Sequence, residues 1–208
     1  MKKIVFVIPY FGNFPEYFEL FLKSCAANPT IDWLLFTDTK EEYIFPENVK
    51  RVLISFEQLR NLIEMKMGFK IALSTPYKLC DYKPAYGFIF SEYICNYDYW
   101  GYCDIDLIFG DIRCFFPDNQ LEKYDKIGHL GHMSLFRNTE YINLMFKKEV
   151  YGMKKYQEVY TSDRIFVFDE WGDTNINLIL KKEGKRVWYW NNFWDVYPYK
   201  DNLRRVTT

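Results

Sequence analysis

The sequence lacks an excess of charge of either sign. Its 27 Lys and Arg residues stand against 28 Asp and Glu residues, giving a formal net charge of −1 at pH 7. A nucleic-acid-binding protein needs a basic surface, so the composition gives that function no support. No apolar run approaches the roughly 20 residues of a membrane-spanning helix. The apolar run after Met1 ends at Pro9 without a small-residue cleavage site, so we expect a strand there and not a signal peptide.

Motifs built on cysteine or glycine are missing as well. The five cysteines include no Cys-x-x-Cys pair and no spacing typical of a zinc site. We interpret them as reduced thiols of a cytoplasmic protein. No glycine-rich phosphate loop of the G-x-G-x-x-G or Walker A type follows the first apolar run. A bound nucleotide would therefore need another partner for its phosphates, and a metal ion is the natural substitute.

Aromatic residues, by contrast, make up 21% of the chain and lead into its most informative stretch. The aromatic run at residues 97–103 is typical of a buried strand and is followed at once by Asp104 and Asp106. Because an unpaired buried carboxylate is very costly, we expect both aspartates at the carboxyl end of the strand, where open α/β sheets bind ligands. Two carboxylates there suit Mg²⁺ or Mn²⁺ carrying a diphosphate. A plain polar turn is the alternative.

The N-terminal part of the chain predicts a βαβ unit. Apolar runs at residues 3–9 and 31–37 are typical of strands buried on both faces, and residues 14–27 carry a helical apolar stripe. The carboxyl ends of the two strands would meet at one edge of the sheet. There, Tyr10 or Phe11 could stack on a base, and Asp38 could accept a hydrogen bond from a base or ribose. Alternatively, Asp38 caps the next turn.

Two further helices are expected in the middle of the chain. Ser55 and Gln58 form a capping-box pattern at the start of the first, after a short predicted strand. The second, nearly all apolar, is predicted over residues 81–95 with Asp81 as its N-cap. Together with Lys83, its start is a candidate phosphate-facing edge. A solvated helix cap is the alternative.

Two histidines, His129 and His132, flank glycines that would let a ligand approach the backbone closely. Either side chain could ligate a metal or contact substrate, with His132 as the candidate for substrate contact. A purely structural role is the alternative for both. A short strand is predicted directly after them, at residues 134–136.

Two acidic residues, Asp169 and Glu170, follow a short apolar run in the C-terminal third of the chain. Either is a candidate catalytic base at a strand-to-helix junction, and Trp171 could form a platform for a sugar. Acidic residues are also favoured by the dipole at any helix N-terminus, which is the alternative. Residues 151–164 before them are the least regular part of the sequence.

The order of these features resembles the GT-A fold of nucleotide-sugar-dependent glycosyltransferases. The blocks that carry the resemblance are residues 8–12, 35–38, 77–87, 100–111 and 131–138. They are similar to a little-characterised bacterial family of such transferases, associated with capsule or lipopolysaccharide assembly. The resemblance implies an α/β, GT-A-like single domain over residues 1–190, with a mostly parallel central sheet flanked by helices. Residues 191–208 are expected to form a tail, partly disordered.

The resemblance also implies roles for site residues. Asp104 and Asp106 would bind the Mn²⁺ or Mg²⁺ ion that holds the donor diphosphate. No histidine follows His132. The late histidine ligand of many such enzymes is therefore missing, and water would take its place. Asp169 and Glu170 would lie on the acceptor side. The residues implied near the donor nucleotide are Pro9, Tyr10, Asp38, Asp81, Lys83 and Asp104.

The implied reaction moves a sugar from a nucleotide-diphosphate sugar, a UDP-sugar being favoured, to a saccharide or lipid-linked acceptor. Inversion is expected if Asp169 or Glu170 deprotonates the acceptor and retention if neither does, and both remain open. A nucleotidyltransferase and a non-catalytic sugar- or nucleotide-binding module are the rival interpretations. A lipid-linked acceptor would place this cytoplasmic protein at the inner face of the cell membrane. The aromatic segment 188–199 could touch that surface, or simply end the core.

Overall fold

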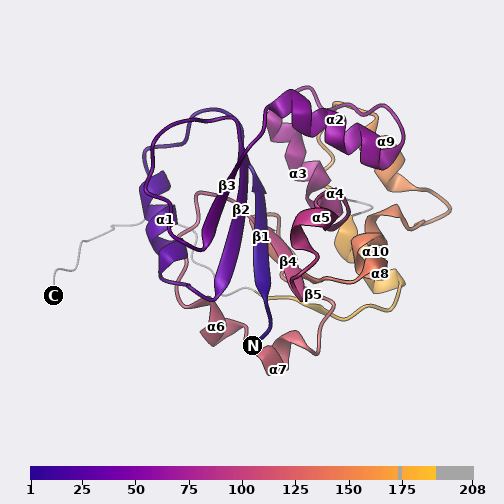
Figure 1. Ribbon diagram of the computed structural model, residues 1–208. Coiled ribbons are helices and arrows are strands. Elements are labelled where there is room, and N and C mark those ends of the chain that lie inside the picture. Colours follow the sequence, from indigo (N-terminus) through magenta and orange to yellow (C-terminus); the bar gives the residue numbers. More distant parts are fainter. Residues whose placement is uncertain (173–174, 191–208) are drawn as a thin grey trace, which may run out of the picture.

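The computed structural model describes residues 1–172 and 175–190. These residues form a seven-stranded sheet in the order β3-β2-β1-β4-β6-β5-β7, with helices on both of its sides (Figure 1). The strands are β1 (Ile4–Pro9), β2 (Ile31–Thr37), β3 (Val49–Leu53), β4 (Tyr99–Cys103), β5 (Lys126–Ile127), β6 (Met133–Arg137) and β7 (Val187–Trp188).

Most neighbouring strands of the sheet run parallel. β1 pairs in parallel with β2 and β4, β2 with β3, and β5 with β7, whereas β6 runs antiparallel to β4 and β5. The fold is therefore the mostly parallel α/β sheet flanked by helices that the sequence predicted. The N-terminal βαβ unit is also confirmed, although its helix, α1 (Phe18–Ala26), begins later than the predicted residue 14.

Alternate side chains of the central strands enter two separate cores. Ile4, Phe6 and Ile8 of β1 pack on the side of α1. Val5 and Val7 of the same strand pack on the other side, toward α2 (Phe56–Met67). Successive residues of a strand point to opposite faces, so a strand covered on both faces reads as one unbroken apolar run. This packing explains the apolar sequence of the strand.

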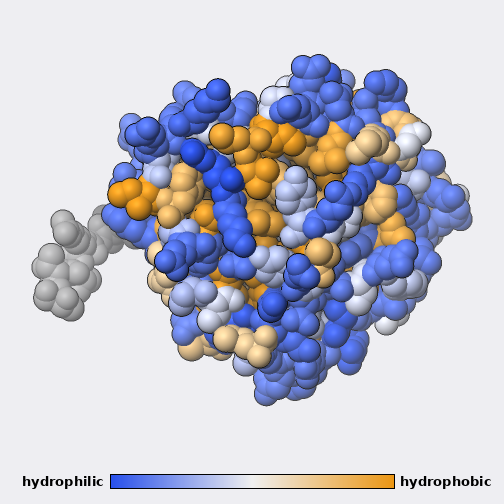
Figure 2. All heavy atoms as spheres, in the orientation of Figure 1, coloured by the Kyte–Doolittle hydropathy of each residue, from blue (hydrophilic) through white to orange (hydrophobic). Residues whose placement is uncertain are grey.

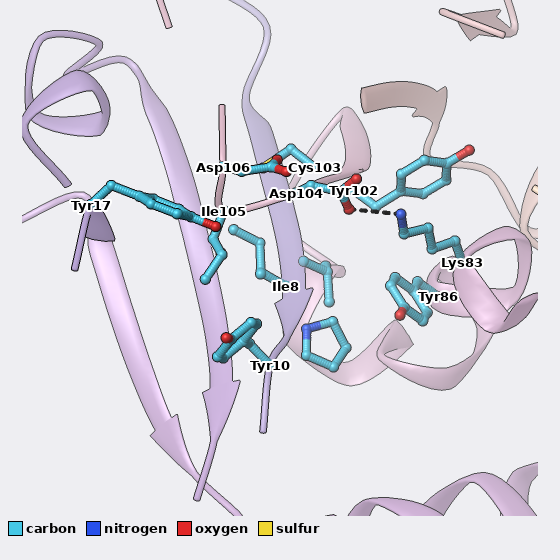
Figure 3. A pocket seen from close by; sticks show the side chains of 12 residues that line it. Ile8, Tyr10, Tyr17, Lys83, Tyr86, Tyr102, Cys103, Asp104, Ile105 and Asp106 are labelled. Carbon is cyan, nitrogen blue, oxygen red and sulfur yellow. Dashed lines mark hydrogen bonds and ion pairs between the residues drawn. The ribbon is translucent and has the colours of Figure 1, made fainter. Parts of the chain in front are cut away.

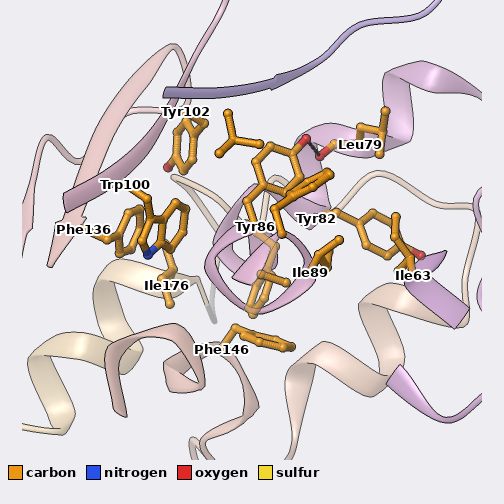
Figure 4. Packing of buried hydrophobic residues seen from close by; sticks show 14 of the residues in the cluster. Ile63, Leu79, Tyr82, Tyr86, Ile89, Trp100, Tyr102, Phe136, Phe146 and Ile176 are labelled. Carbon is orange, nitrogen blue, oxygen red and sulfur yellow. Dashed lines mark hydrogen bonds between the residues drawn. The ribbon is translucent and has the colours of Figure 1, made fainter. Parts of the chain in front are cut away.

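The core on the α2 side contains many aromatic rings (Figure 4). The rings of Trp100 and Phe136 stack with centroids 4.5 Å apart, and those of Tyr82 and Tyr160 with centroids 4.2 Å apart. Helical segments whose residues enter this core are α2, α3 (Leu79–Tyr82), η2 (Lys83–Ala85), α4 (Tyr86–Ile89), α5 (Ser91–Ile94), α8 (Glu140–Asn143), η3 (Met145–Lys147), α9 (Lys155–Tyr160) and α10 (Ile176–Lys182). Those that enter the other core are α1, α6 (Ile112–Phe115) and α7 (Asp118–Leu121).

The prediction of a single helix over residues 81–95 is wrong. The structure divides this stretch among α3, η2 (Lys83–Ala85), α4 and α5, and a further turn, η1 (Pro76–Lys78), precedes it. Pro84 has no N–H to donate and its ring disfavours a continuous helix, which breaks the segment near its start. Gly87 packs so closely on the Trp100 ring that a Cβ atom would overlap it. Contact with β4 therefore requires a glycine at this position of α4.

The structure confirms the capping box at Ser55 but not the irregular conformation expected for residues 151–164. The capping box is confirmed: the Gln58 N–H donates to Ser55 Oγ at 3.1 Å, and the Ser55 N–H donates to Gln58 Oε1 at 2.8 Å. Residues 151–164, expected to be irregular, contain α9. Its Val159 and Tyr160 are fully buried in the aromatic core, so tertiary contacts stabilise a helix that its polar sequence does not predict.

Most of the surface visible in Figure 2 is hydrophilic, and apolar residues reach it mainly in the central part of that face. Within the described residues, no helix combines the length and the apolar character needed to cross a membrane. The predicted tail, residues 191–208, lies outside the described residues, as does most of the aromatic segment 188–199.

Candidate active site

The strand order creates a crevice between β1 and β4. From β1 the chain continues through α1 to β2 and then β3, whereas β4 pairs with the opposite edge of β1. Ligands of open α/β sheets bind outside the carboxyl ends of the strands at such a reversal of strand order. β1 ends at Pro9 and β4 at Cys103, and the residues that follow, Tyr10 and Asp104, both line a cavity there.

The loop after β1 forms one wall of the crevice. Tyr10 stacks on Phe14 with ring centroids 5.4 Å apart, and its hydroxyl donates to Asn13 O at 3.1 Å. The Gly12 N–H donates to Asp38 Oδ1 at 3.0 Å, so this carboxylate holds the loop. Asp38 lines neither of the two cavities described below.

Asp104 is tied to a lysine at the centre of the crevice. Lys83 Nζ donates to Asp104 Oδ1 at 2.8 Å (Figure 3). It also donates to Gly131 O at 2.8 Å and lies 3.8 Å from Asp169 Oδ2. Burial alone would lower the lysine pKa, but the attraction of Asp104 and Asp169 outweighs it and raises that pKa. Lys83 is therefore a cation at neutral pH. Burial raises the pKa of Asp104 despite the opposing attraction of Lys83.

Two cavities meet at this ion pair. The first, of about 230 Å³, lies between the end of β1 and the turn at residues 104–106 and includes Tyr17 and Asp106. The second, of about 560 Å³, extends past Phe11, Tyr77 and His132 to the acidic pair at residues 169–170. The residues lining both are Pro9, Tyr10, Lys83, Tyr86 and Asp104. The crevice thus has two compartments with the Lys83–Asp104 pair between them.

The two predicted acceptor-side carboxyl groups differ in their surroundings. Glu170 Oε2 accepts a hydrogen bond from the Gly131 N–H at 2.6 Å. Asp169 is 3% exposed, and its buried Oδ1 has no hydrogen-bond partner among the described residues. Its Oδ2 lies so close to Gly131 that a Cβ atom there would overlap it. The close approach that glycine permits here is made by Asp169, which the sequence did not predict.

The protonation of Asp169 is poised near neutrality. Burial, with a smaller contribution from the charge of Glu170, raises its pKa to about 7, although Lys83 opposes the shift. A carboxyl group with such a pKa can take up or release a proton at physiological pH, as a general base or acid must. His132 lines the same cavity, and burial lowers its pKa, so its imidazole is neutral at pH 7.

A buried lysine behind the site escaped the sequence reasoning. Lys126 Nζ donates to Gly128 O at 2.6 Å, Ser134 Oγ at 3.0 Å and Asn177 Oδ1 at 2.9 Å. Burial lowers its pKa to about 7, against the attraction of the two acidic residues 169 and 170. Its position next to the apolar Ile127 was the available signal, but solvent-exposed lysines are far commoner.

Besides Asp38, two more predicted site residues lie away from both cavities. Asp81 is not an N-cap: it lies inside α3, is fully buried, and accepts hydrogen bonds from Lys78 and from the backbone of residues 166 and 168. Trp171 lines neither cavity, and 58% of it is exposed. Conversely, Tyr17 and Tyr86 line the crevice although the sequence indicated only packing roles for them.

The site contains carboxyl groups but no preformed cage for a metal ion. Within residues 1–172 and 175–190, no three or more His, Cys, Asp and Glu side chains are arranged to hold one. Asp104 and Asp106 line the first cavity, and Mg²⁺ is commonly held by one or two carboxylates, waters and substrate phosphates. A diphosphate would be repelled by these acidic groups unless a cation accompanied it. The residues therefore fit a divalent cation that arrives with a diphosphate.

Together, the sheet and the crevice define a mixed α/β protein with a small-ligand site at the reversal of its strand order. The chain belongs to a family described as a family of unknown function, DUF6625, whose model matches residues 6–208. No curated protein matches the sequence.

Similar solved structures include two of the galactosyltransferase LgtC. One is in complex with donor and acceptor sugar analogues, and the other is an active-site mutant. Identity is 14% to each, over 90% of this chain and 73% and 72% of theirs, with TM-scores of 0.46 and 0.48. Neither the identity nor the TM-scores are high enough to carry an argument about activity.

Proposed function

We propose that this protein is a glycosyltransferase that moves a sugar from a nucleotide-diphosphate sugar to a hydroxyl group of a saccharide or lipid-linked acceptor. The observation that supports it is the crevice itself. It joins an aromatic wall at Tyr10, a carboxylate pair at Asp104 and Asp106, and a buried acid, Asp169, whose pKa is about 7. A UDP-sugar is the favoured donor, because the sequence resembles transferases of that kind.

The donor is proposed to lie across the first cavity. Tyr10 and Tyr17 present rings on which a base can stack. Asp104 and Asp106 would hold a Mn²⁺ or Mg²⁺ ion, which when bound neutralises charge on the departing diphosphate. Lys83 lies at the boundary of the two cavities, where its charge can also stabilise the leaving group.

The acceptor is proposed to enter the second cavity, whose far end carries Asp169. The acceptor oxygen attacks the anomeric carbon, the bond from that carbon to the diphosphate breaks, and the nucleoside diphosphate leaves with the electron pair. Ionised Asp169 takes the hydroxyl proton. The neutral His132 imidazole can hydrogen-bond to the acceptor, and exposed Tyr77 offers a ring for a sugar. Direct displacement of this kind inverts the anomeric configuration, which NMR of the product would report.

A thermal-shift panel tests the proposal first. Nucleoside diphosphates and nucleotide sugars are each added with and without Mn²⁺, since a ligand that binds only the folded state raises the melting temperature. We expect a rise that needs both UDP, or its sugar, and the metal. The double variant Asp104→Asn with Asp106→Asn should lose this rise, while the control Asp98→Asn, whose carboxylate bonds to the Lys3 N–H outside the crevice, should keep it.

The same panel separates the alternatives. Stabilisation by saccharides alone, without nucleotide or metal, would indicate a binding module. Stabilisation by a nucleoside triphosphate together with a sugar phosphate, but by no nucleoside diphosphate, would indicate a nucleotidyltransferase. A panel without any metal-dependent rise would overturn the glycosyltransferase proposal.

A further inference from the structure

The strongest feature outside the two cavities is a fully buried ion pair on the back of the site. Lys78 and Asp81 are 1% and 0% exposed, and Lys78 Nζ donates to Asp81 Oδ2 at 2.8 Å. Lys78 also donates to Arg164 O and lies 5.0 Å from the centre of the Phe166 ring. All of these contacts point to one short stretch of chain, residues 164–168, which leads directly into Asp169.

The Asp81 carboxylate is the acceptor for two backbone N–H groups of that stretch. The Phe166 N–H donates to Oδ2 at 3.0 Å, and the Phe168 N–H donates to Oδ1 at 3.0 Å. Such a carboxylate fixes the positions of two residues at once, because both N–H groups must converge on it. The chain is therefore held on both sides of Val167, at the peptide groups 165–166 and 167–168.

Val167 has the conformation that needs such support. Its φ is +54°, in the left-handed region, which a β-branched residue adopts only when its surroundings impose it. Its carbonyl accepts from the Glu170 N–H at 3.2 Å and from the Trp171 N–H at 3.0 Å. The strained residue is thus the pivot of a turn that places the acidic pair at the cavity.

The segment that contains Lys78 and Asp81 also supplies the lysine that lies beside the Asp169 carboxylate. Lys83 follows Asp81 by two positions, and its Nζ lies 3.8 Å from Asp169 Oδ2. Within residues 78–83, Lys78 and Asp81 therefore bind the stretch that precedes Asp169, and Lys83 lies beside the Asp169 carboxylate. Replacing a buried ion pair by apolar residues is often neutral or even stabilising, so stability alone does not account for these contacts.

We propose that Lys78 and Asp81 are positioning residues, which keep residues 164–168 in the strained conformation that buries the Asp169 carboxylate beside Lys83. The functional meaning of this arrangement rests on the proposed role of Asp169 as a base. The geometric statement is independent of any substrate, and it is tested without one.

Hydrogen exchange and a titration of Asp169 test the proposal. In the wild type, we expect the Phe166 and Phe168 amides to exchange slowly. In the double variant Lys78→Met with Asp81→Leu, both charges and both acceptors are gone, so these two amides should exchange at least about tenfold faster. The pKa of Asp169, followed by carboxyl ¹³C NMR and assigned with Asp169→Asn, should fall toward its ordinary range as the carboxylate gains water.

A matched control has the same chemistry elsewhere. Glu64 Oε2 accepts from Lys70 Nζ at 2.8 Å, and its Oε1 accepts from the Ile71 N–H at 3.3 Å. The double variant Glu64→Leu with Lys70→Met should speed exchange at Ile71 only and leave the pKa of Asp169 unchanged. A merely stabilising role for Lys78 and Asp81 would change the melting temperature but leave the Asp169 titration where it was.

Two outcomes would overturn the proposal. One is rapid exchange of the Phe166 and Phe168 amides in the wild type. The other is an unchanged Asp169 pKa in the Leu variant. If that variant does not fold, Lys78→Met with Asp81→Asn decides, because a neutral amide oxygen is a weaker acceptor than a carboxylate oxygen, and unchanged protection of both amides would contradict the model. If neither the wild type nor any of these variants binds a nucleotide, the proposed function is overturned, but this inference is unaffected.

Discussion

At the scale of single residues, burial shifts the pKa of an acid, Asp169, and the pKa of a base, Lys126, toward each other. The pKa of Asp169 is raised to about 7 and that of Lys126 is lowered to about 7, in each case mainly because burial disfavours the charged form. Each lies within the electrostatic reach of the other. Perturbed titratable groups in a cleft are characteristic of functional sites, although structural networks also produce them.

The first prediction concerns Asp169→Asn. The folded-state pKa lies above the unfolded value near 3.9, so the wild-type carboxyl costs stability once pH rises through this window toward 7 and above. The variant should therefore be more stable than the wild type at pH 8, by ~1–3 kcal/mol, and equally stable below pH 4. Urea denaturation at both pH values measures this difference.

Activity should change in the opposite direction in the same variant. If Asp169 is the base, glycosyl transfer should fall by about 10²- to 10⁴-fold, and the wild-type rate should rise with pH through about 7. A variant that is less stable at pH 8 would show that the carboxyl is not penalised by burial. Unchanged transfer would remove Asp169 from the mechanism.

The second prediction concerns Lys126→Met. Between pH 7 and about 10.4 the unfolded lysine holds a proton that the folded one releases, so this group makes the wild type more stable as pH rises. The variant lacks that dependence. The stability difference between wild type and variant should change by about 1 kcal/mol per pH unit between pH 7.5 and 9.5. Lys123→Met, on the exposed end of a turn, is the control: its difference in stability from the wild type should not change with pH.

At the scale of elements, the carboxyl ends of two strands and one glycine loop build the crevice. β1 and β4 deliver Tyr10 and Asp104, and the loop before β6 brings the backbone of Gly131 against the acidic pair. Lys126 donates a hydrogen bond to Gly128 O of this loop, so the geometry of the loop depends on a residue that does not line either cavity. Loop residues positioned by a rigid sheet in this way are typical of binding sites.

The third prediction concerns Gly131→Ala. A Cβ atom at this position would overlap Asp169 Oδ2 and crowd the Glu170 carboxyl group, so one of the carboxylates must move. We expect glycosyl transfer to fall by about 10²-fold or more, because misplacement of a catalytic group by about 1 Å has effects of this size. Gly110→Ala is the control, since its Cβ would meet nothing within 4 Å. Equal activities of the two variants would contradict the geometry.

The fourth prediction concerns the start of α2. Ser55→Ala removes the side-chain acceptor of the Gln58 N–H and should lower the free energy of unfolding by about 1 kcal/mol. Ser55→Gly should cost only a few tenths of that, because glycine itself is a good N-cap. Chemical denaturation compares the three proteins. Nucleotide-induced thermal shifts should be the same in all of them, since α2 lines neither cavity.

At the scale of the whole molecule, two cores on opposite faces of one sheet support a crevice at its edge. The larger core holds the aromatic stacks of Trp100 and Tyr82, and the other holds the side chains of β1 that face α1. The described residues bury these cores without any preformed metal cage. Stability and metal binding should therefore be separable properties of the protein.

The fifth prediction tests that separation. A chelator such as EDTA should leave the melting temperature of the nucleotide-free protein unchanged. With UDP and Mn²⁺ present at about 100 times their dissociation constant, stability should rise by ~2.7 kcal/mol, and EDTA should cancel the rise. A fall in melting temperature on adding EDTA alone would indicate a structural metal. A UDP effect that survives EDTA would indicate nucleotide binding without a metal.

Much of the fold followed from local pattern. The apolar runs of β1 and β2, the capping box at Ser55 and the end of β4 before Asp104 were predicted because each depends on residues close in sequence. The single helix over residues 81–95 was predicted wrongly, because Pro84 interrupts a continuous helix near its start. Asp81 was misplaced because its partners at residues 166 and 168 are distant in sequence.

The sequence by itself determined the strands β1, β2 and β4 and which residues end them, because side-chain alternation and the cost of buried charge act over a few neighbouring residues. Only the tertiary structure decided that Lys83 lies between Asp104 and Asp169, and that Asp169 rests on Gly131. Those contacts join segments that are far apart along the chain. The pKa of Asp169 follows from them, because burial and neighbouring charge exist only once the segments are packed.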